Sequence, residues 1–498
     1  MASVTSTAEL ETTPSLEEVR VLAREHALVP LRHTYIADCE TPVSAYLKLR
    51  GDGPSFLLES AEQGQRFGRW SFLGYRPRSV IRLEQGVLTV GGEPREAADP
   101  YAAVAEELER YRIAPLAGLP PFAGGAVGLF GYDLVRHTEP TIGPGNPDEL
   151  GTPDMALMVS DVLVAFDHLR HEVTILANVF VAGDVDRAHA EALEAIGEVR
   201  ERLAAPVPRG PRSRRCEPPA FTSNMGSEGY AAAVDRCKEY IRAGDAYQIV
   251  PSQRWSAELA KDAFSIYRGL RAINPSPYMY FLDFGDFEIA GASPESLIKV
   301  TGRRAEQRPI AGTRPRADTV EGDLERAESL LADEKERAEH VMLVDLARND
   351  LGRVCDYGSV QVDELMVVET YSHVLHIVSS VSGQLRDGVS AIDALEASLP
   401  AGTLSGAPKI RAMQIIDELE PVRRGPYGGA VGYLSYTGEL DTCIYIRSAV
   451  VKDGRVHVQA GGGIVADSEA GYEVRETEAK ARSVFASIEL ACEQEDWA

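Results

Sequence analysis

Hydrophobic residues recur with helical spacing in some stretches of the chain and alternate with polar residues in others. Ser15 has a side chain suited to an N-cap, and Gly244 is suited to follow the last turn of a helix. The spacing predicts helices in SLEEVRVLAREH from Ser15, around Tyr101 to Tyr111, around Val185 to Leu203, in SEGYAAAVDRCKEYIRAGD up to Gly244, and in KERAEHVMLVDLARNDLGR from Lys335 to Arg353.

Alternating stretches are separated by short turns, which predicts strands joined as hairpins. The predicted strands include SFLLES, YMYFLDFGDFEIAGA and TYSHVLHIVSSVSG. Turns are predicted at Gln85-Gly86, Thr437-Gly438 and Asp453-Gly454. Two-residue turns join antiparallel strands, so we predict an α+β fold of antiparallel sheets packed with helices, and no doubly wound parallel sheet.

The pentapeptide GGAVG occurs twice, at Gly124 to Gly128 and at Gly428 to Gly432. It could mark the same strand-and-turn device in two related halves of the chain. Five residues are weak evidence for a repeat, and coincidence explains them equally well.

A chain of 498 residues is too long to fold around one ordinary hydrophobic core, so we expect two or three domains. We predict a disordered tail over 1–15, an N-terminal domain over 16–205, a linker over 206–221 and a second domain over 222–490. The linker contains PRGPRSRRCEPPA, whose Pro and Arg residues are typical of an exposed connection. A basic binding patch is the alternative interpretation of its arginines.

Acidic residues outnumber basic ones by 76 to 51, a formal charge of -25. Such a surface repels phosphate backbones and anionic lipid, so we expect neither nucleic acid nor membrane partners. The six cysteines form no CxxC pair, which argues against a disulfide framework or a zinc site and suits a reducing compartment. The first residues lack the pattern of a signal peptide, and we expect a cytoplasmic protein.

Two ExxE pairs stand in predicted helices far apart in the sequence: Glu336 with Glu339, and Glu473 with Glu476. Residues three apart share a helix face, and like charges there repel. A solvated surface is the ordinary explanation of one such pair. Two pairs could instead converge on one divalent ion, and an all-oxygen, water-rich shell suits Mg²⁺ rather than zinc.

His373 and His376 are three apart on a predicted strand, so they face opposite sides and cannot share a metal. One of them facing inward could transfer protons, although a core histidine is the commoner case. Three glycine-rich turns are predicted nearby: PIAGT, AGTLSGAPK and QAGGGIV. Their N–H groups could approach a carboxylate substrate, or they could be ordinary hairpin turns.

Together these stretches resemble the chorismate-utilising enzymes, and within that family the large subunits of anthranilate synthase. The resemblance is strongest over 222–490 and continues more weakly to about residue 27. The motifs that carry it stand in the family's order: PIAGTRPR, DEKERAEHVMLVDLARNDLGRV, SHVLHIVS, LPAGTLSGAPKIRAMQIIDELE, GPYGGAVGYLSY, CIYIRS, QAGGGIVADS and YEVRETEAKA.

The resemblance implies a two-subdomain chorismate-binding fold and a Mg²⁺-dependent reaction in which chorismate and ammonia give anthranilate and pyruvate, the first committed step of tryptophan biosynthesis. By likeness, Glu339 and Glu476 would bind Mg²⁺, Glu336 and Glu473 would hold its waters, and His376 would assist departure of the ring hydroxyl. The implied substrate-binding residues are Ala311, Gly312, Thr313, Tyr427, Arg447, Gly461, Gly462, Gly463 and Lys480.

Three positions favour ammonia as the nucleophile. Ala311 replaces the nucleophilic lysine of relatives that make 4-amino-4-deoxychorismate, and Gln248 replaces the lysine that activates water in isochorismate and salicylate synthases. Thr403 agrees with the ammonia-using branch. An enzyme that stops at aminodeoxyisochorismate and a non-catalytic tryptophan-binding subunit remain the alternatives.

A second site is implied by the same resemblance, for tryptophan as a feedback inhibitor. Its expected residues are Glu59, Ser60, Pro277, Tyr278, Met279, Val431, Tyr433 and Cys443. A proline-fixed turn over a core would also explain NPSPYM. No glutaminase nucleophile motif surrounds any cysteine, so we expect ammonia to come from a separate glutamine amidotransferase subunit.

Overall fold

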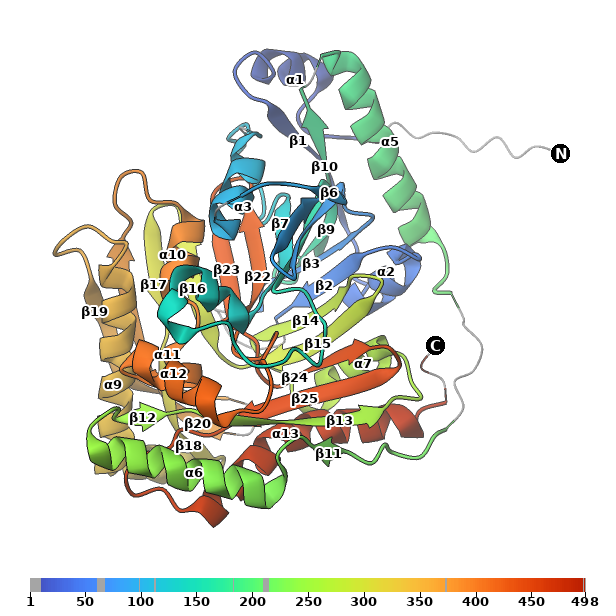
Figure 1. The fold of residues 1–498 in the computed structure, drawn as a ribbon. Coiled ribbons are helices and arrows are strands. Elements are labelled where there is room, and N and C mark those ends of the chain that lie inside the picture. The colour runs from blue at the N-terminus through green and yellow to red at the C-terminus, as the bar shows by residue number, and fades with distance from the viewer. Residues whose placement is uncertain are drawn as a thin grey trace.

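The computed structural model describes residues 10–60, 68–97, 99–111, 113–181, 183–208, 215–371, 374–495 and 497. Their strands form two large sheets and one short pair (Figure 1). In spatial order, the first sheet contains β1 (Leu28–Ile36), β10 (Glu172–Phe180), β9 (Val162–Asp167), β3 (Trp70–Tyr75), β2 (Ser55–Glu59), β14 (Tyr278–Asp283), β15 (Phe287–Ser293), β24 (Ser448–Lys452), β25 (Arg455–Gly461), β13 (Ser252–Glu258) and β11 (Thr222–Ser223).

The second sheet is equally long, and β19 (Gln361–Thr370) pairs with its strand β20 outside the main order. Its order is β18 (Ile310–Pro315), β20 (Val374–Gln384), β17 (Arg304–Gln307), β16 (Ser296–Thr301), β23 (Leu440–Ile444), β22 (Ala430–Ser435), β7 (Gly125–Phe130), β8 (Met155–Ser160), β4 (Ser79–Glu84), β5 (Val87–Val90) and β6 (Glu93–Pro94). The short pair is β12 (Gln248–Ile249) with β21 (Gly406–Ala407).

Helices flank both sheets. They are α1 (Leu16–Leu22), α2 (Pro42–Leu49), α3 (Pro100–Glu109), α4 (Val135–Thr138), α5 (Val185–Ala204), α6 (Gly226–Ala243), α7 (Ala263–Ile273), α8 (Val320–Ala332), α9 (Glu334–Gly352), α10 (Ala391–Ser398), α11 (Gly402–Ser405), α12 (Lys409–Leu419) and α13 (Ala470–Glu493), with short 3-10 turns at Tyr132–Leu134 and Pro140–Ile142.

The first sheet is buried on both faces, because its strands carry apolar residues at successive positions. In β14, Phe281 packs into a core with α2, α5, α7 and α13, whereas Tyr280 points to the core shared with the second sheet. Helices α3, α9 and α10 add their apolar residues to this shared core. The result is a layered α+β sandwich, and the predicted fold class is confirmed.

The strand order reveals two halves with the same topology. Outward from the pair β2–β14, the first sheet runs β3, β9, β10, β1 on one side and β15, β24, β25, β13 on the other. Outward from β7–β22, the second sheet runs β8, β4, β5 and β23, β16, β17. In each sheet, the strands of one series follow one another along the chain in the same order as the strands at the matching positions of the other series.

This equivalence explains the repeated pentapeptide GGAVG. The two copies lie in or beside β7 and β22, which pair with each other at the centre of the second sheet, and Gly128 lies opposite Gly432. The interpretation as a device shared by two related halves is therefore favoured over coincidence. Between β17 and β22 the second half carries an insertion, from β18 to α12, that has no counterpart of similar size in the first.

Most predicted elements are confirmed. Ser15 caps α1 in a capping box, and Gly244 ends α6 in the left-handed conformation. The three predicted turns join β4–β5, β22–β23 and β24–β25, all antiparallel. Apart from an isolated parallel bridge between Leu28 and Ile113, every strand pairing among the described residues is antiparallel.

Two of the predicted glycine-rich turns are wrong. AGTLSGAPK forms the short helix α11 and the strand β21. PIAGT lies largely in strand β18, where the pairing with β20 shifts register between Ala311 and Thr313. Gly312 sits at that shift with φ 68°, a conformation that glycine adopts without strain. The glycine signalled a bulge inside a strand, which a sequence pattern does not distinguish from a hairpin turn.

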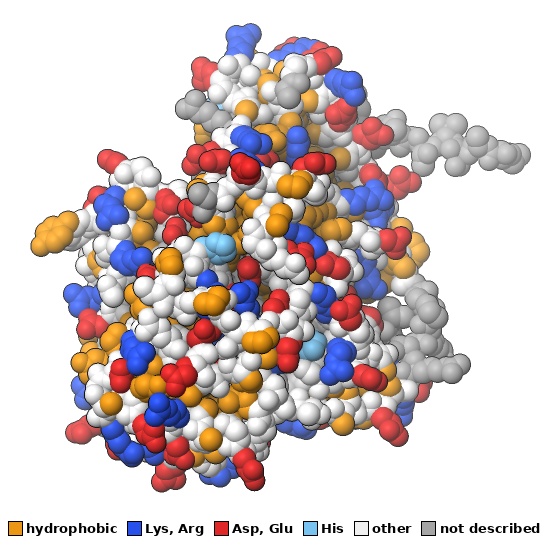
Figure 2. Space-filling view, in the orientation of Figure 1, with side chains coloured by type: hydrophobic (Ala, Val, Ile, Leu, Met, Phe, Trp, Pro, Cys, Tyr) orange, Lys and Arg blue, Asp and Glu red, His pale blue; other side chains and the backbone are white. Residues whose placement is uncertain are grey.

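Some predictions concern residues that the structure does not describe. Residues 1–9 of the predicted tail, His373 and most of the basic cluster from Arg209 to Arg215 lie outside the described residues. The proposed domain boundaries stay a prediction, and both sheets contain strands from either side of 206–221. No helix within the described ranges is long and apolar enough to cross a membrane. On the face drawn in Figure 2, acidic and basic side chains are interspersed.

The close packing of β22 against its neighbour β23 can be tested at Gly432. A Cβ at this position would overlap the carbonyl oxygen of Asp441 on the neighbouring strand β23. We expect Gly432→Ala to lower the free energy of unfolding by about 3 kcal/mol, because the clash is with backbone that cannot move aside. The urea midpoint measures the effect. Gly53→Ala is the control, since its added Cβ meets nothing within 4 Å, and equal midpoints for both variants would contradict the prediction.

Candidate functional site

A cavity of about 490 Å³ opens between β18, β20, α9, the start of α13 and the loop after β25. Every residue predicted for catalysis, substrate binding or metal binding lines it except Gly462. The residues that line it include Gln248, Ala311, Gly312, Thr313, Glu336, Glu339, His376, Thr403, Tyr427, Arg447, Gly461, Gly463, Glu473, Glu476 and Lys480.

The two ExxE pairs face this one cavity from two helices. Asp333 caps α9 through the N–H groups of Lys335 and Glu336, so the first pair lies in the first two turns of that helix. The second pair lies in the first two turns of α13. Both helices therefore direct their positive N-terminal ends to the cavity, which partly offsets the carboxylates.

The carboxylates are not fully compensated by their neighbours. Burial, together with the charge of Glu336, raises the pKa of Glu339 above its usual range. Burial also raises the pKa of Glu473, whose Oε2 is buried and has no hydrogen-bond partner in the described part of the chain. Glu476 is paired with Lys480 at 2.7 Å.

The side chains suit an oxygen-bound divalent ion. A cation among them would satisfy Glu473 Oε2 and relieve the repulsion between the carboxylates, and glutamates that also hold water are typical donors for Mg²⁺. Within the described residues, however, no three His, Cys, Asp or Glu side chains are grouped closely enough to hold a metal together. The arrangement is thus compatible with few direct ligands and several waters.

His376 lies on β20 and is oriented by the bulge in β18. Its Nδ1 donates to the carbonyl oxygen of Gly312 at 2.8 Å and lies 3.2 Å from the Thr313 hydroxyl. Burial lowers the pKa of the imidazole. A neutral ring that donates through Nδ1 has its lone pair on Nε2, so His376 is set up to accept a proton.

The glycines after β25 allow side chains to approach the backbone. A Cβ on Gly463 would lie 2.6 Å from Gln248 Nε2, and one on Gly462 would lie 3.1 Å from Glu473 Oε2. The Gly462 N–H lies 3.2 Å from the Tyr230 hydroxyl oxygen and 3.3 Å from the Pro251 carbonyl oxygen, and so points away from the cavity.

Cationic and hydroxyl groups form another part of the cavity wall. Arg447 is half-buried, has φ 53° and donates to the carbonyl oxygen of Lys480. Lys480 Nζ donates to the Gly461 carbonyl oxygen at 3.0 Å. Tyr427 is buried beside Gly461, and burial raises its pKa, so its hydroxyl stays protonated. This wall can bind a carboxylate by two-pronged and hydroxyl contacts.

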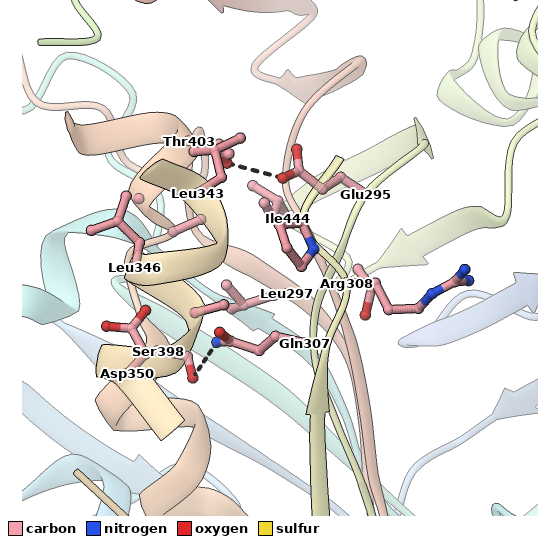
Figure 3. Close-up of a pocket in the computed structure, with 15 residues that line it drawn as sticks. Glu295, Leu297, Gln307, Arg308, Leu343, Leu346, Asp350, Ser398, Thr403 and Ile444 are labelled. Atoms are coloured by element: carbon pink, nitrogen blue, oxygen red, sulfur yellow. Dashed lines mark hydrogen bonds between the residues drawn. The ribbon is translucent and has the colours of Figure 1, made fainter. Parts of the chain in front are cut away.

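Glu295 was missed by the sequence reasoning. It lies in the turn between β15 and β16, lines the main cavity and accepts a hydrogen bond from Thr403 Oγ1 at 3.1 Å (Figure 3). Burial raises its pKa to about 7. It also borders the smaller cavity of about 40 Å³ drawn in Figure 3. A single acid in ASPES has no periodicity that would reveal it.

Three further polar residues of the cavity were not predicted, namely Arg314, Lys335 and Gln459. Lys335 directly precedes Glu336, and its charge favours the ionised forms of Glu339 and Glu473. Arg314 donates to Glu336 Oε1 at 3.3 Å. Arg314 and Lys335 both belong to motifs noted in the sequence. Cations beside acids are usually surface ion pairs, so the sequence did not indicate that these two line the cavity.

A second cavity, of about 150 Å³, lies where β2, β14 and β22 meet, and all eight residues predicted for tryptophan line it. Glu59 is paired with Arg271 at 2.9 Å and accepts from the Tyr267 hydroxyl. The Ser60 hydroxyl is buried and has no partner among the described residues. An apolar space with a few fixed polar groups is typical of a small-molecule site.

Comparisons with known proteins agree with this geometry. Residues 53–486 match the chorismate binding enzyme family. The chain is 50% identical to anthranilate synthase component 1 of Pseudomonas aeruginosa, over 95% of this chain and 98% of that protein. It is 44% identical to the component 1 of Mycolicibacterium smegmatis, over 97% and 95%.

Solved structures show the same fold. Anthranilate synthase component I from Streptococcus pneumoniae superposes with a TM-score of 0.78 at 40% identity, over 91% of this chain and 99% of that chain. The menaquinone-specific isochorismate synthase of Escherichia coli superposes with a TM-score of 0.71 over 95% and 98%, and at 18% identity it shows the fold alone. The chain therefore belongs to the chorismate-binding enzyme family, as a homologue of anthranilate synthase component 1.

Proposed function

We propose that the chain converts chorismate and ammonia to anthranilate and pyruvate, in the first committed step of tryptophan biosynthesis. The observation that carries the proposal is the single cavity that gathers the two glutamate pairs, His376, Thr403 and Arg447. The names of relatives that match nearly the whole chain support it.

Charge explains how an acidic cavity binds a dianion. The four glutamates of the two pairs face four cations, Arg314, Lys335, Arg447 and Lys480, so the protein alone offers the substrate no surplus positive charge. We assign Mg²⁺ to Glu339 and Glu476, with Glu336 and Glu473 holding its waters. When bound, the ion would neutralise the ring carboxylate as a Lewis acid. Arg447 and Tyr427 would hold the other carboxylate.

The nucleophile follows from the residues at two positions of the cavity. Ala311 and Gln248 offer no amine to attack the ring and no base to activate water. Gln248 lines the same cavity as Glu339 and favours the ionised form of that carboxylate. Ammonia would add to the ring as the hydroxyl leaves.

Two groups divide the proton transfers. A carboxyl with a pKa of about 7 holds a proton for part of the time at neutral pH, so Glu295 would protonate the departing hydroxyl to give water, with Thr403 orienting it. Neutral His376 can only accept, so it would take the ring proton as pyruvate is eliminated. The resemblance by itself implies instead that His376 assists departure of the ring hydroxyl.

Ammonia would come from a glutamine amidotransferase subunit, since the relatives are named as component 1 of their enzyme. The second cavity would bind tryptophan as an inhibitor. Its apolar wall of Pro277, Met279 and Val431 suits an indole, and Ser60 offers an unused hydroxyl to the amino acid end.

The reaction itself is tested by anthranilate fluorescence from the purified chain with chorismate and an ammonium salt, with Mg²⁺ and then with EDTA. We expect a signal that EDTA abolishes. Glu339→Gln should reduce it more than about 100-fold, because loss of even an outer metal partner costs about 10 to 100-fold. Circular dichroism checks the fold of the variant.

Other results would redirect the assignment. Chorismate consumed without fluorescence or pyruvate would indicate aminodeoxyisochorismate as the product. Tight tryptophan binding without turnover from any nitrogen source would indicate a regulatory subunit. Full activity of Glu339→Gln would end the metal assignment.

The proton donor is tested by the pH dependence of kcat/KM for chorismate at a fixed concentration of free ammonia. Because Glu295 must be protonated, kcat/KM should fall as the pH rises through about 7. Glu295→Gln should lower kcat by about 100-fold or more and remove this limb. Glu288→Gln is the control, since burial also raises the pKa of Glu288 to about 7, outside the cavity. An unchanged limb in Glu295→Gln would exclude the role.

The inhibitor site is tested by the concentration of tryptophan that halves the activity. Glu59→Gln should raise this concentration by about 10-fold. The reason is that a hydrogen bond between the charged Glu59 carboxylate and the bound tryptophan would contribute about 1.5 kcal/mol or more. Activity without tryptophan should stay within about twofold. Glu107→Gln is a matched control, being a buried glutamate paired with Arg95 outside the cavity. Equal sensitivity of the two variants would count against the site.

A further inference from the structure

Two cysteines far apart in the sequence have their sulfur atoms in contact. Cys216 lies within the predicted linker and Cys492 lies in the last turn of α13, 276 residues later. Their Sγ atoms are 2.6 Å apart, and the Cys216 N–H donates to the Cys492 carbonyl oxygen at 3.1 Å. Both are free thiols. The two backbones therefore run side by side where the side chains meet.

The contact is held in place from both sides. Towards the amino end, Arg215 pairs with Glu495 at 3.1 Å. At the other end of the segment, the rings of Phe221 and Phe485 pack at a tilt with centroids 4.3 Å apart. The segment from 215 to 221 thus runs antiparallel to the end of α13, and the thiols meet in the middle of a fixed stretch.

The surroundings differ from those of the other cysteines. Cys237, Cys355 and Cys443 are buried, Cys39 is exposed, and none of them has a sulfur neighbour among the described residues. Cys216 is half-buried and so open to a small reagent, whereas Cys492 behind it is buried. Burial and the neighbouring Cys216 raise the pKa of the Cys492 thiol, and the charge of Lys261 offsets only part of this rise.

We propose that Cys216 and Cys492 form a covalent cross-linking site, closed by exchange with a low-molecular-weight disulfide such as oxidised glutathione. The Cys216 thiolate attacks one sulfur of the reagent and releases one thiol. Cys492 then loses its proton, attacks the Cys216 sulfur and releases the second thiol. Two cysteine thiols are oxidised to one disulfide, and one disulfide of the reagent is reduced to two thiols.

The disulfide would join the two ends of the chain segment that forms the second half. Residues 216 and 492 bracket the whole of it, from α6 to α13. The closed loop reduces the freedom of the unfolded chain, so the cross-link should stabilise this half against unfolding. The proposal does not rest on the proposed function, because neither cysteine lines the active cavity.

The test uses the full chain carrying Cys39→Ser, which removes the exposed thiol. After incubation with oxidised glutathione, alkylation with N-ethylmaleimide and digestion, mass spectrometry should find the peptides of Cys216 and Cys492 joined. Thiol titration of the unfolded protein should show a loss of two thiols, reversed by dithiothreitol. The thermal midpoint should rise on oxidation.

Two variants control for side effects. Adding Cys216→Ser or Cys492→Ala to the same background should abolish the joined peptides and the rise in midpoint, and circular dichroism of each reduced variant checks its fold. Glutathione retained on Cys216 beside an alkylated Cys492 would overturn the proposal. So would recovery of both cysteines in alkylated form, or an equal rise in midpoint for the variants.

Discussion

The site depends on one electrostatic constraint: four glutamates from two helices must face the same cavity although they repel one another. Three features make this tolerable. The positive ends of α9 and α13 point to the cavity, Lys335 and Lys480 stand beside the acids, and glycine at 462 leaves room for the Glu473 carboxylate. The remaining repulsion between the carboxylates would be relieved by the divalent cation that we propose.

The two halves have the same strand topology, but only the second half supplies the glutamates of the cavity. Both halves contribute equivalent strands to the two sheets, which join at β2–β14 and β7–β22. Only the second half carries the insertion from β18 to α12, which supplies α9, the bulge at Gly312 and Thr403 in α11. The helix after β25 supplies the other glutamate pair. The cavity that gathers the two glutamate pairs is thus formed by only one half of a duplicated framework.

The sequence predicted what local patterns encode. Helical spacing located α9 and α13, and Asp453-Gly454 located a hairpin, because these depend on neighbouring residues. The convergence of the glutamates depends on packing between distant segments and rested on resemblance. PIAGT was misread because a bulge and a turn both require glycine. Glu295 was missed because its importance comes from burial, which one acid in a turn does not announce.

The two ligand-sized cavities differ in what they touch. Every described residue that lines the active cavity comes from position 248 or later, whereas the second cavity is lined by β2 of the first half and by β14 and β22 of the second. In the function that we propose, the inhibitor would bind where the two halves meet, whereas the reaction would take place within the second half. Substitutions in the first half would then change inhibitor binding without replacing any residue that lines the larger cavity.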